Sequence, residues 1–127
     1  MGVQNKGKKV LIVDDQENIR EVISYVLEER GFIAEDAENG KEALKKVAQD
    51  KPDIIILDVA MPEMDGIQAC RLLRENPDTR DIPIIFLSAQ QRRVFEFISG
   101  MQGASIEYID KPCDMEYLIR RINYLLA

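Results

Sequence analysis

The chain has 127 residues and a mass of 14.5 kDa, enough for one hydrophobic core and with little room for a second domain. It carries 17 basic and 23 acidic residues, and the net charge of −6 disfavours direct binding of nucleic acid, whose phosphates require clustered lysines and arginines. The absence of histidine excludes Ser-His-Asp and Cys-His catalysis and removes the commonest nitrogen ligand of zinc.

No sequence feature directs the chain to a membrane or out of the cytoplasm. Residues 1–9 are polar and basic with no apolar stretch after them, so we expect no signal peptide. The longest apolar runs have about four residues, too few to cross a bilayer. Cys70 and Cys113 are far apart and form no CxxC motif, so we expect two reduced thiols in a cytoplasmic protein without membrane contact.

Five short apolar runs are predicted to be β-strands. They are residues 10–13, 32–34, 54–57, 84–87 and 106–109. The first, third and fourth are rich in β-branched residues and lack polar alternation, which is typical of strands buried on both faces. Glu35 and Asp36 follow the second run and Glu107 interrupts the fifth, so we expect these two strands at the edges of a sheet.

Apolar residues at helical spacing follow each of the five strands. In chain order the stripes are Ile19, Val22, Ile23, Val26 and Leu27; Ala43, Leu44, Val47 and Ala48; Gly66, Ala69, Cys70 and Leu73; Val94, Phe97, Ile98 and Met101; Met115, Leu118, Ile119, Ile122 and Leu126. Gly31 and Gly103 are expected to end the first and fourth helices, and Asp65 and Asp114 to cap the third and fifth. The alternation predicts a (βα)5 α/β fold, a doubly wound parallel sheet with helices on both faces.

Polar residues follow four of the predicted strands, at the edge of the sheet where such folds bind ligands. Asp14 and Asp15 come after the first strand and Asp58 after the third. Ser88 follows the fourth strand and Lys111 the fifth. We therefore expect three carboxylates, a hydroxyl and an ammonium group to converge. The first strand is not followed by a glycine-rich loop, which argues against a dinucleotide site or a P-loop.

This set of groups suits phosphoryl transfer. Neighbouring carboxylates repel one another, and a hard divalent cation such as Mg²⁺ or Mn²⁺ would relieve the repulsion. A carboxylate beside a metal ion and a lysine is a competent nucleophile toward phosphorus and would form an acyl phosphate. Asp58 ends an Ile-Ile-Ile-Leu run and is predicted to be buried, where only a specific role justifies the cost.

Four sequence blocks carry a family resemblance. They are VLIVDD at residues 10–15, DVAMPEMDG at 58–66, LSA at 87–89 and YIDKP at 108–112. In this order and at these separations they resemble the receiver domain of response regulators in two-component signalling, including the chemotaxis regulators. The resemblance implies a flavodoxin-like sheet with strand order 2-1-3-4-5. It also implies a receiver domain at residues 9–127, after a flexible N-terminal segment at residues 1–8.

The resemblance implies roles for the acidic residues. Asp58 matches the phosphoacceptor. Asp14 and Asp15 match the acidic pair that binds Mg²⁺, for which Mn²⁺ can substitute, and Asp58 and the main-chain carbonyl of Ala60 complete the protein ligands.

It also implies roles for residues after the fourth and fifth strands. Lys111 matches the lysine that pairs with the phosphoryl group, and a cis Lys111–Pro112 peptide bond is expected to aim it there. Ser88 matches the hydroxyl that bonds a phosphoryl oxygen, and Tyr108 matches the aromatic switch that moves with it. Phe95 lies off the apolar stripe of its helix and is expected to be partly exposed, as a possible anchor for a partner.

The function implied is a phosphorylation-switched signalling domain rather than an enzyme. It would accept a phosphoryl group from a histidine kinase or a histidine phosphotransfer protein, and catalyse only its own Mg²⁺-dependent phosphorylation and slow dephosphorylation. Ala60 and Gln90 occupy positions that tune phosphoryl lifetime in the family, and neither can act as a base. The fourth helix, fifth strand and fifth helix would change on phosphorylation and control a downstream protein, an effector domain outside this chain, or a phosphorylation-dependent homodimer.

One interval departs from the family pattern. Three residues, Ser105, Ile106 and Glu107, separate the Gly103-Ala104 pair from Tyr108, where two are usual. Because a register slip would turn Lys111 away from the site, we expect the extra residue to be absorbed before Tyr108, as a wider turn or bulge around residues 105–107.

Other readings of these residues remain open at this level. Asp15 could cap a helix, Ser88 could be a turn hydroxyl and Tyr108 a half-exposed strand residue. The domain could be a degenerate docking module that works without phosphorylation. A haloacid-dehalogenase-like phosphatase would need an acid where Ala60 stands, and a flavodoxin-like FMN carrier would need a phosphate site where the first loop is acidic.

Overall fold

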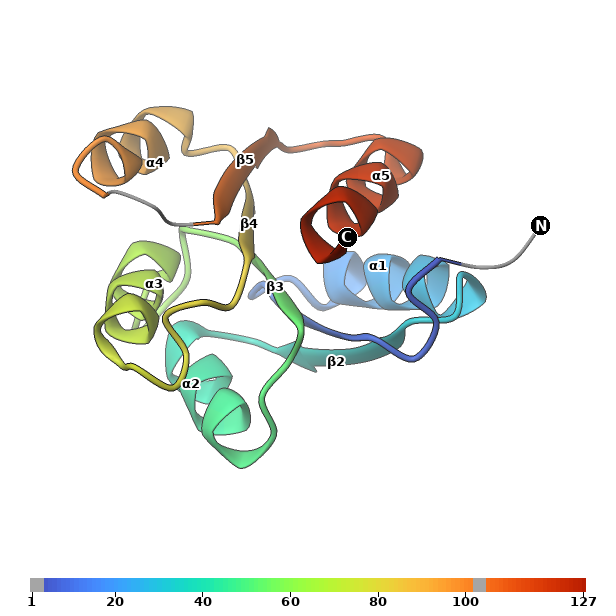
Figure 1. The fold of residues 1–127 in the computed structure, drawn as a ribbon. Helices are drawn as coiled ribbons and strands as arrows, with labels where there is room; N and C mark the ends of the chain where they lie inside the picture. The colour runs from blue at the N-terminus through green and yellow to red at the C-terminus, as the bar shows by residue number, and fades with distance from the viewer. Residues whose placement is uncertain (1–3, 102–104) are drawn as a thin grey trace.

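Strands and helices alternate along the chain in the computed structural model, which describes residues 4–101 and 105–127 (Figure 1). The strands are β1 Lys9–Val13, β2 Ile33–Ala37, β3 Ile54–Leu57, β4 Ile84–Ser88 and β5 Ile106–Asp110. The helices are α1 Glu17–Glu29, α2 Gly40–Gln49, α3 Gly66–Glu75, α4 Gln91–Ile98 and α5 Met115–Leu126. Within the described residues, none of the helices combines the length and the hydropathy needed to span a bilayer.

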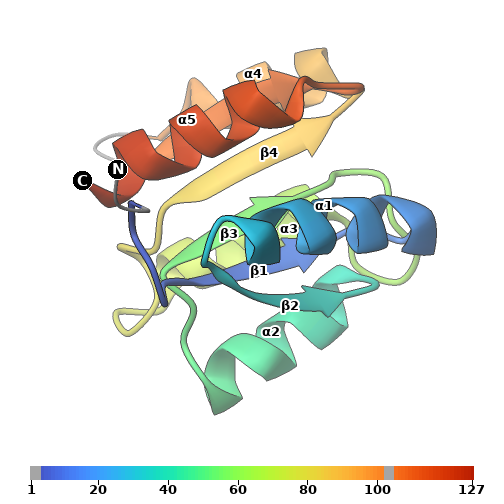
Figure 2. The same cartoon turned by 90° about the vertical axis from the view of Figure 1, so that its right-hand side faces the viewer.

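The five strands form one parallel sheet in the order β2-β1-β3-β4-β5. The arrowheads of β1, β2 and β4 point the same way in Figure 2, so their carboxyl ends meet at one edge of the sheet. The predicted fold class and strand order are confirmed, and β2 and β5 are the edge strands as expected.

The core has two halves, one on each face of the sheet. Helices α1 and α5 cover one face, and α2, α3 and α4 cover the other (Figure 1). Successive residues of β1 alternate between them: Leu11 and Val13 pack toward α2 and α3, whereas Val10 and Ile12 pack toward α1 and α5. Burial on both sides explains why the central strands are continuously apolar.

The helix ends follow the local sequence signals, with one exception. Asp65 and Gln68 form a capping box at α3, Asp114 accepts a hydrogen bond from the main chain of α5, and Gly31 follows α1 with φ of +89°. The prediction for α4 was wrong: the helix ends at Ile98, and Gly103 lies outside the described residues.

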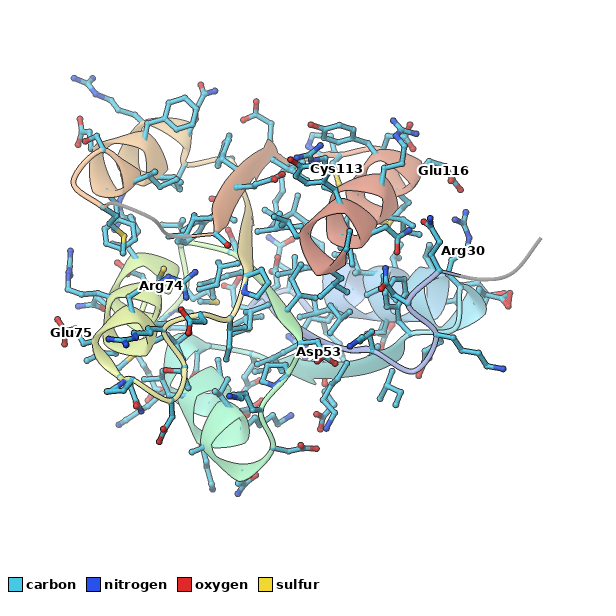
Figure 3. All side chains as sticks on the ribbon, in the orientation of Figure 1. Arg30, Asp53, Arg74, Glu75, Cys113 and Glu116 are labelled. Atoms are coloured by element: carbon cyan, nitrogen blue, oxygen red, sulfur yellow. The ribbon has the colours of Figure 1, made fainter. Side chains whose placement is uncertain are left out.

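Two apolar positions differ from the periodicity-based expectation. Val22 belongs to the apolar stripe of α1 but is 56% exposed. The buried residues of this helix are Ile23 and Leu27, which pack into the core between α1, α5 and the sheet. Phe32 precedes β2 instead of beginning it, and the strand continues through the acidic residues to Ala37. Near the end of α3, two consecutive side chains point in different directions: Glu75 is exposed to solvent, and the partly buried Arg74 is directed toward the rest of the domain (Figure 3).

Residues 4–8 of the expected flexible segment contact the rest of the domain. The side-chain amide of Asn5 donates to Asn123 Oδ1 over 2.7 Å, and Gly7 N donates to the Gly31 carbonyl over 2.8 Å. These hydrogen bonds attach the segment to α5 and to the turn after α1, while the domain boundary itself stays a prediction.

Strand β5 keeps a regular register with β4. Ile106 lies opposite Ile84 and Tyr108 opposite Phe86, so the register holds from Tyr108 onward as expected, and residues 106 and 107 pair regularly without a bulge. Continuous pairing of a half-buried strand resists such a distortion. The Gly103-Ala104 pair, against which the extra residue was counted, lies outside the described residues.

The loop between β3 and α3 is closed by a close backbone approach at Gly66. Its N–H donates to the Val59 carbonyl over 2.9 Å, and a Cβ atom at this position would lie 1.9 Å from the Asp58 carbonyl oxygen. Only glycine therefore allows α3 to start this near the end of β3.

Gly66→Ala should lower the free energy of unfolding by about 1–3 kcal/mol, because backbone atoms must move to admit the methyl group. Urea denaturation measures the loss. Gly100→Ala is the control, since its Cβ would meet nothing closer than 3.8 Å and a change within about 0.5 kcal/mol is expected. Equal effects of the two substitutions would contradict the role of close packing at Gly66.

Candidate functional site

Two buried carboxylates lie side by side at the ends of β1 and β3. The strands pair in register up to Val13 and Leu57, so the next residues, Asp14 and Asp58, are neighbours. Only 3% of Asp14 and 7% of Asp58 is exposed. Asp15 is exposed, and oxygen atoms of the three carboxylates lie within 4.8 Å of one another. The predicted convergence of the three acids is present in the structure.

Lys111 supplies the positive charge between the two buried acids. Its Nζ lies 2.6 Å from Asp14 Oδ2 and 3.1 Å from Asp58 Oδ2. Burial by itself would lower the pKa of Lys111, but the hydrogen bonds to the two carboxylates outweigh it and raise the pKa above its usual value. The ammonium group points to Asp58 as expected, and the Lys111–Pro112 peptide bond is cis, also as expected.

Main-chain donors fix the orientation of both carboxylates. Asp14 Oδ1 accepts from Gln16 N over 2.9 Å, and Asp58 Oδ1 accepts from Val59 N over 2.7 Å. Each carboxylate therefore has one oxygen bound to the backbone and the other facing Lys111. Because both groups are tied at two points, the site is organised before any ligand binds.

Arg20 braces the turn that carries Asp14 and Asp15. Its Nη1 donates to the Asp14 carbonyl over 2.7 Å, and its Nε donates to Asp36 Oδ2 over 2.9 Å. Burial works against the charge of Arg20, but the hydrogen bond and charge of Asp36 raise its pKa. The guanidinium thus joins α1, β2 and the β1–α1 turn.

The other expected site residues lie around this cluster. Ser88 is fully buried and its Oγ accepts from Gln90 N over 3.0 Å, so its hydroxyl does act in a turn. The Tyr108 hydroxyl lies 2.8 Å from the Ser88 carbonyl oxygen and 2.5 Å from Asp110 Oδ1. Ala60 is exposed in the loop after β3. Asp15 does not cap α1, because the N-cap residue is Gln16.

Comparison with known proteins places this site in a family. The family model for the response regulator receiver domain matches residues 10–123. The chain belongs to this family. It is 39% identical over 118 residues to the response regulator MprA of Mycolicibacterium vanbaalenii and 41% identical over the same length to that of Mycobacterium leprae. Each alignment covers 93% of this chain and 50% of the relative, so the receiver domain spans about half the length of these regulators.

Solved structures show the same fold. The signal receiver domain of a signal transduction histidine kinase from Syntrophus aciditrophicus is 39% identical, with a TM-score of 0.83 and coverage of 94% of this chain and 90% of that one. The chemotaxis protein CheY4 of Vibrio cholerae is 31% identical, with a TM-score of 0.84 and coverage of 94% and 99%.

A third solved structure is a complex with a ligand. Response regulator TrrA from Thermotoga maritima, in complex with Mg²⁺-BeF, is 34% identical with a TM-score of 0.80, and the match covers 94% of this chain and 99% of that one. The resemblance to receiver domains is thus confirmed. The protein contains a phosphorylation-switched signalling domain of the response regulator class, and such domains are signalling modules rather than enzymes in the ordinary sense.

Sequence reasoning missed two polar residues and a groove near the site. Arg20 lies outside the four sequence blocks, and Asp110 lies within the block at 108–112 without a predicted role; both act through hydrogen bonds. Asp110 and Tyr108 share one face of β5 because they are two residues apart. An apolar groove of about 430 Å³ opens beside Lys111, between α1 and the loop before α5. The exposed Val22 lines it, as does Cys113. Cys113 lies in the loop before α5 (Figure 3).

Lys111→Met should lower the free energy of unfolding by about 2–3 kcal/mol, because Asp14 and Asp58 are then buried together without a cation. Urea denaturation at neutral pH measures the effect. Lys45→Met, on the exposed face of α2, is the matched control and should change stability by less than about 0.5 kcal/mol. A Lys111 variant as stable as the control would show that the ion pairs contribute nothing.

Proposed function

We propose that this receiver domain accepts a phosphoryl group onto Asp58 from the phosphohistidine of a histidine kinase or a histidine phosphotransfer protein. The observation that carries the proposal is the buried Asp58 carboxylate, 7% exposed, with the Lys111 ammonium 3.1 Å away and two further acids beside it. A carboxylate at a buried strand end is costly unless it is used, and this one faces the groups that phosphoryl transfer requires.

The proposed reaction exchanges one bond to phosphorus for another. A carboxylate oxygen of Asp58 attacks phosphorus, the phosphorus–nitrogen bond breaks, and the imidazole of the donor leaves with the electron pair of that bond. The hydrogen bond from Val59 N holds the carboxylate in one orientation, and Lys111 neutralises charge on the transferred oxygens. Ala60 and Gln90 offer no base to activate water, so we expect the acyl phosphate to be long-lived.

The acidic cluster fits a magnesium ion. Oxygen ligands of one Mg²⁺ lie at most about 4.2 Å apart, since each is about 2.1 Å from the ion. One oxygen of each of the three carboxylates lies within 4.8 Å of the others, close to this limit, and a side-chain rotation of the exposed Asp15 would adjust the spacing. We assign Asp14, Asp15, Asp58 and the Ala60 carbonyl as ligands, with Mn²⁺ as a substitute. The ion would withdraw charge from the phosphoryl oxygens.

The response would involve Ser88, Tyr108 and the surface formed by α4, β5 and α5. In this proposal the Ser88 hydroxyl leaves Gln90 N and bonds a phosphoryl oxygen, and Tyr108 moves with it. Phe95, 52% exposed on α4, packs edge to face on Tyr108 with ring centroids 5.4 Å apart, so a movement of Tyr108 changes that surface directly. The expected partial exposure of Phe95 is confirmed.

The surface would act on a downstream protein, an effector domain or a second copy of the chain. The MprA relatives are about twice as long as the match, which supports an effector domain in proteins of this kind. The net charge of −6 argues against direct contact of this domain with nucleic acid. The free thiols of Cys70 and Cys113 favour a cytoplasmic location.

Asp58→Asn should abolish phosphorylation by acetyl phosphate, because the amide cannot form the acyl phosphate. Intact-mass spectrometry in the presence and absence of Mg²⁺ measures the addition of one phosphoryl group. Asp81→Asn, an exposed position between α3 and β4, should label like the wild type. Undiminished labelling of the Asp58 variant would overturn the assignment, and a wild type that never labels would favour the docking module.

Phe95→Ala should weaken self-association in Mg²⁺ and beryllofluoride by about tenfold if Phe95 anchors the interface, as buried interface aromatics do. Sedimentation equilibrium measures the dimerisation constant, and acetyl phosphate labelling of Asp58 should be retained. Leu72→Ala is a control on α3, where an exposed apolar residue lies outside this surface. A variant that dimerises normally would remove Phe95 from the interface.

A further inference from the structure

Tyr108 is held by an acidic residue of its own strand. Tyr108 and Asp110 are two residues apart on β5, so both side chains project from the same face. The Tyr108 hydroxyl lies 2.5 Å from Asp110 Oδ1 and 2.8 Å from the carbonyl oxygen of Ser88. Asp110 is exposed, whereas the ring of Tyr108 packs against the core on the side of α3 and α4.

The two acceptors are not equivalent. A phenol has one proton to donate, and a separation of 2.5 Å is typical of a hydrogen bond to a charged carboxylate. The Ser88 carbonyl also accepts from Lys111 N over 3.1 Å, so it has a donor without Tyr108. Burial and the Asp110 carboxylate both raise the pKa of Tyr108, as expected for a phenol that donates to an anion. Asp110 is therefore the stronger of the two attachments.

Neighbouring groups complete the same arrangement. The Tyr108 ring meets Phe95 of α4 at an interplanar angle of 74°, and the Ser88 hydroxyl is engaged with Gln90 N. For Ser88 and Tyr108 to move toward Asp58, the bonds to Gln90 and Asp110 must both break. The bond to Gln90 is an uncharged one, which leaves the bond to Asp110 as the larger obstacle.

We propose that Asp110 is a positioning residue that holds Tyr108 in the arrangement of the unphosphorylated domain and so reduces the affinity of the site for a phosphoryl group. The inference rests on the proposed function of Asp58. It assigns to Asp110 a specific effect: the carboxylate stabilises one of the two arrangements, and binding at Asp58 must overcome it.

Asp110→Asn tests the proposal, because asparagine keeps the size of the side chain and replaces the charged acceptor by a neutral one. The probe is beryllofluoride with Mg²⁺, and the readout is its half-saturating concentration, followed by ¹H–¹⁵N NMR of the whole chain. We expect a decrease of about three- to tenfold, the amount by which a charged hydrogen bond exceeds a neutral one at a partly exposed site. Asp110→Glu, which keeps the carboxylate, should stay nearer to the wild type.

Tyr108→Phe separates the hydrogen bond from the simple loss of a negative charge near an anionic ligand. In a Tyr108→Phe background the hydroxyl is absent, so adding Asp110→Asn should change the half-saturating concentration by less than about twofold. The ring resonances of ¹³C-labelled tyrosine in the ligand-free protein give a second readout, in which Asp110→Asn should shift the Tyr108 signal.

The measurements distinguish failure of the positioning role from failure of the proposed function. An equal effect of Asp110→Asn with and without the Tyr108 hydroxyl, or no effect in either background, overturns the positioning role while leaving the proposed function intact. A wild type whose spectrum does not respond to beryllofluoride, or an Asp58→Asn variant that responds equally, overturns the proposed function and the inference with it. A decrease confined to the background with the hydroxyl supports both.

Discussion

One ammonium group lies between two buried carboxylates at the end of the sheet, and the site depends on this arrangement. Neighbouring parallel strands are about 4.8 Å apart, so acids that follow β1 and β3 are forced into proximity. Burial removes the water that would screen their charges, and the single positive charge of Lys111, in contact with both Asp14 and Asp58, offsets part of their repulsion. Because Lys111 follows β5, the position of an edge strand is coupled electrostatically to the two strands at the centre.

The sequence predicted most of the fold because strands and helices alternate five times along the chain, and each kind of element has its own hydrophobic period. Continuous β-branched runs identified the doubly buried strands, and the rule that ligands bind at the carboxyl ends located Asp14, Asp58 and Lys111. Helical periodicity identifies an apolar stripe but does not show which other elements pack against each residue of the stripe. For that reason it overestimated the burial of Val22 and extended α4 beyond Ile98.

Hydrogen bonds made by individual side chains could not be predicted from the sequence for a different reason. The contact of Arg20 with the Asp14 carbonyl depends on how β2 places Asp36, and the contact of Asp110 with Tyr108 depends on side-chain rotation at an edge strand. Neither is determined by residue type and spacing alone. Arg20 lies outside the four sequence blocks, and Asp110 lies in the block at 108–112 but has no role that the resemblance implies. The resemblance therefore did not indicate either contact.

The eight residues of α4, all of them described, include a single buried side chain, that of Val94. Complete burial of such a side chain is worth about 1.5–3 kcal/mol, whereas moving a two-state equilibrium from 1:99 to 99:1 requires about 5.5 kcal/mol. Two hydrogen bonds to a charged phosphoryl group, at about 1.5–3 kcal/mol each, approach that amount. A helix with one fully buried side chain, and with Phe97 and Ile98 only partly buried against the core, can thus be reoriented by bonds formed at another strand end. The fully buried central strands would cost far more to disturb, and they keep the geometry of the site unchanged. The acidic site lies on strands whose side chains are almost all buried, whereas α4 buries few side chains and is easier to move. The number of buried side chains in each element therefore determines which part of the domain can move and which part stays fixed.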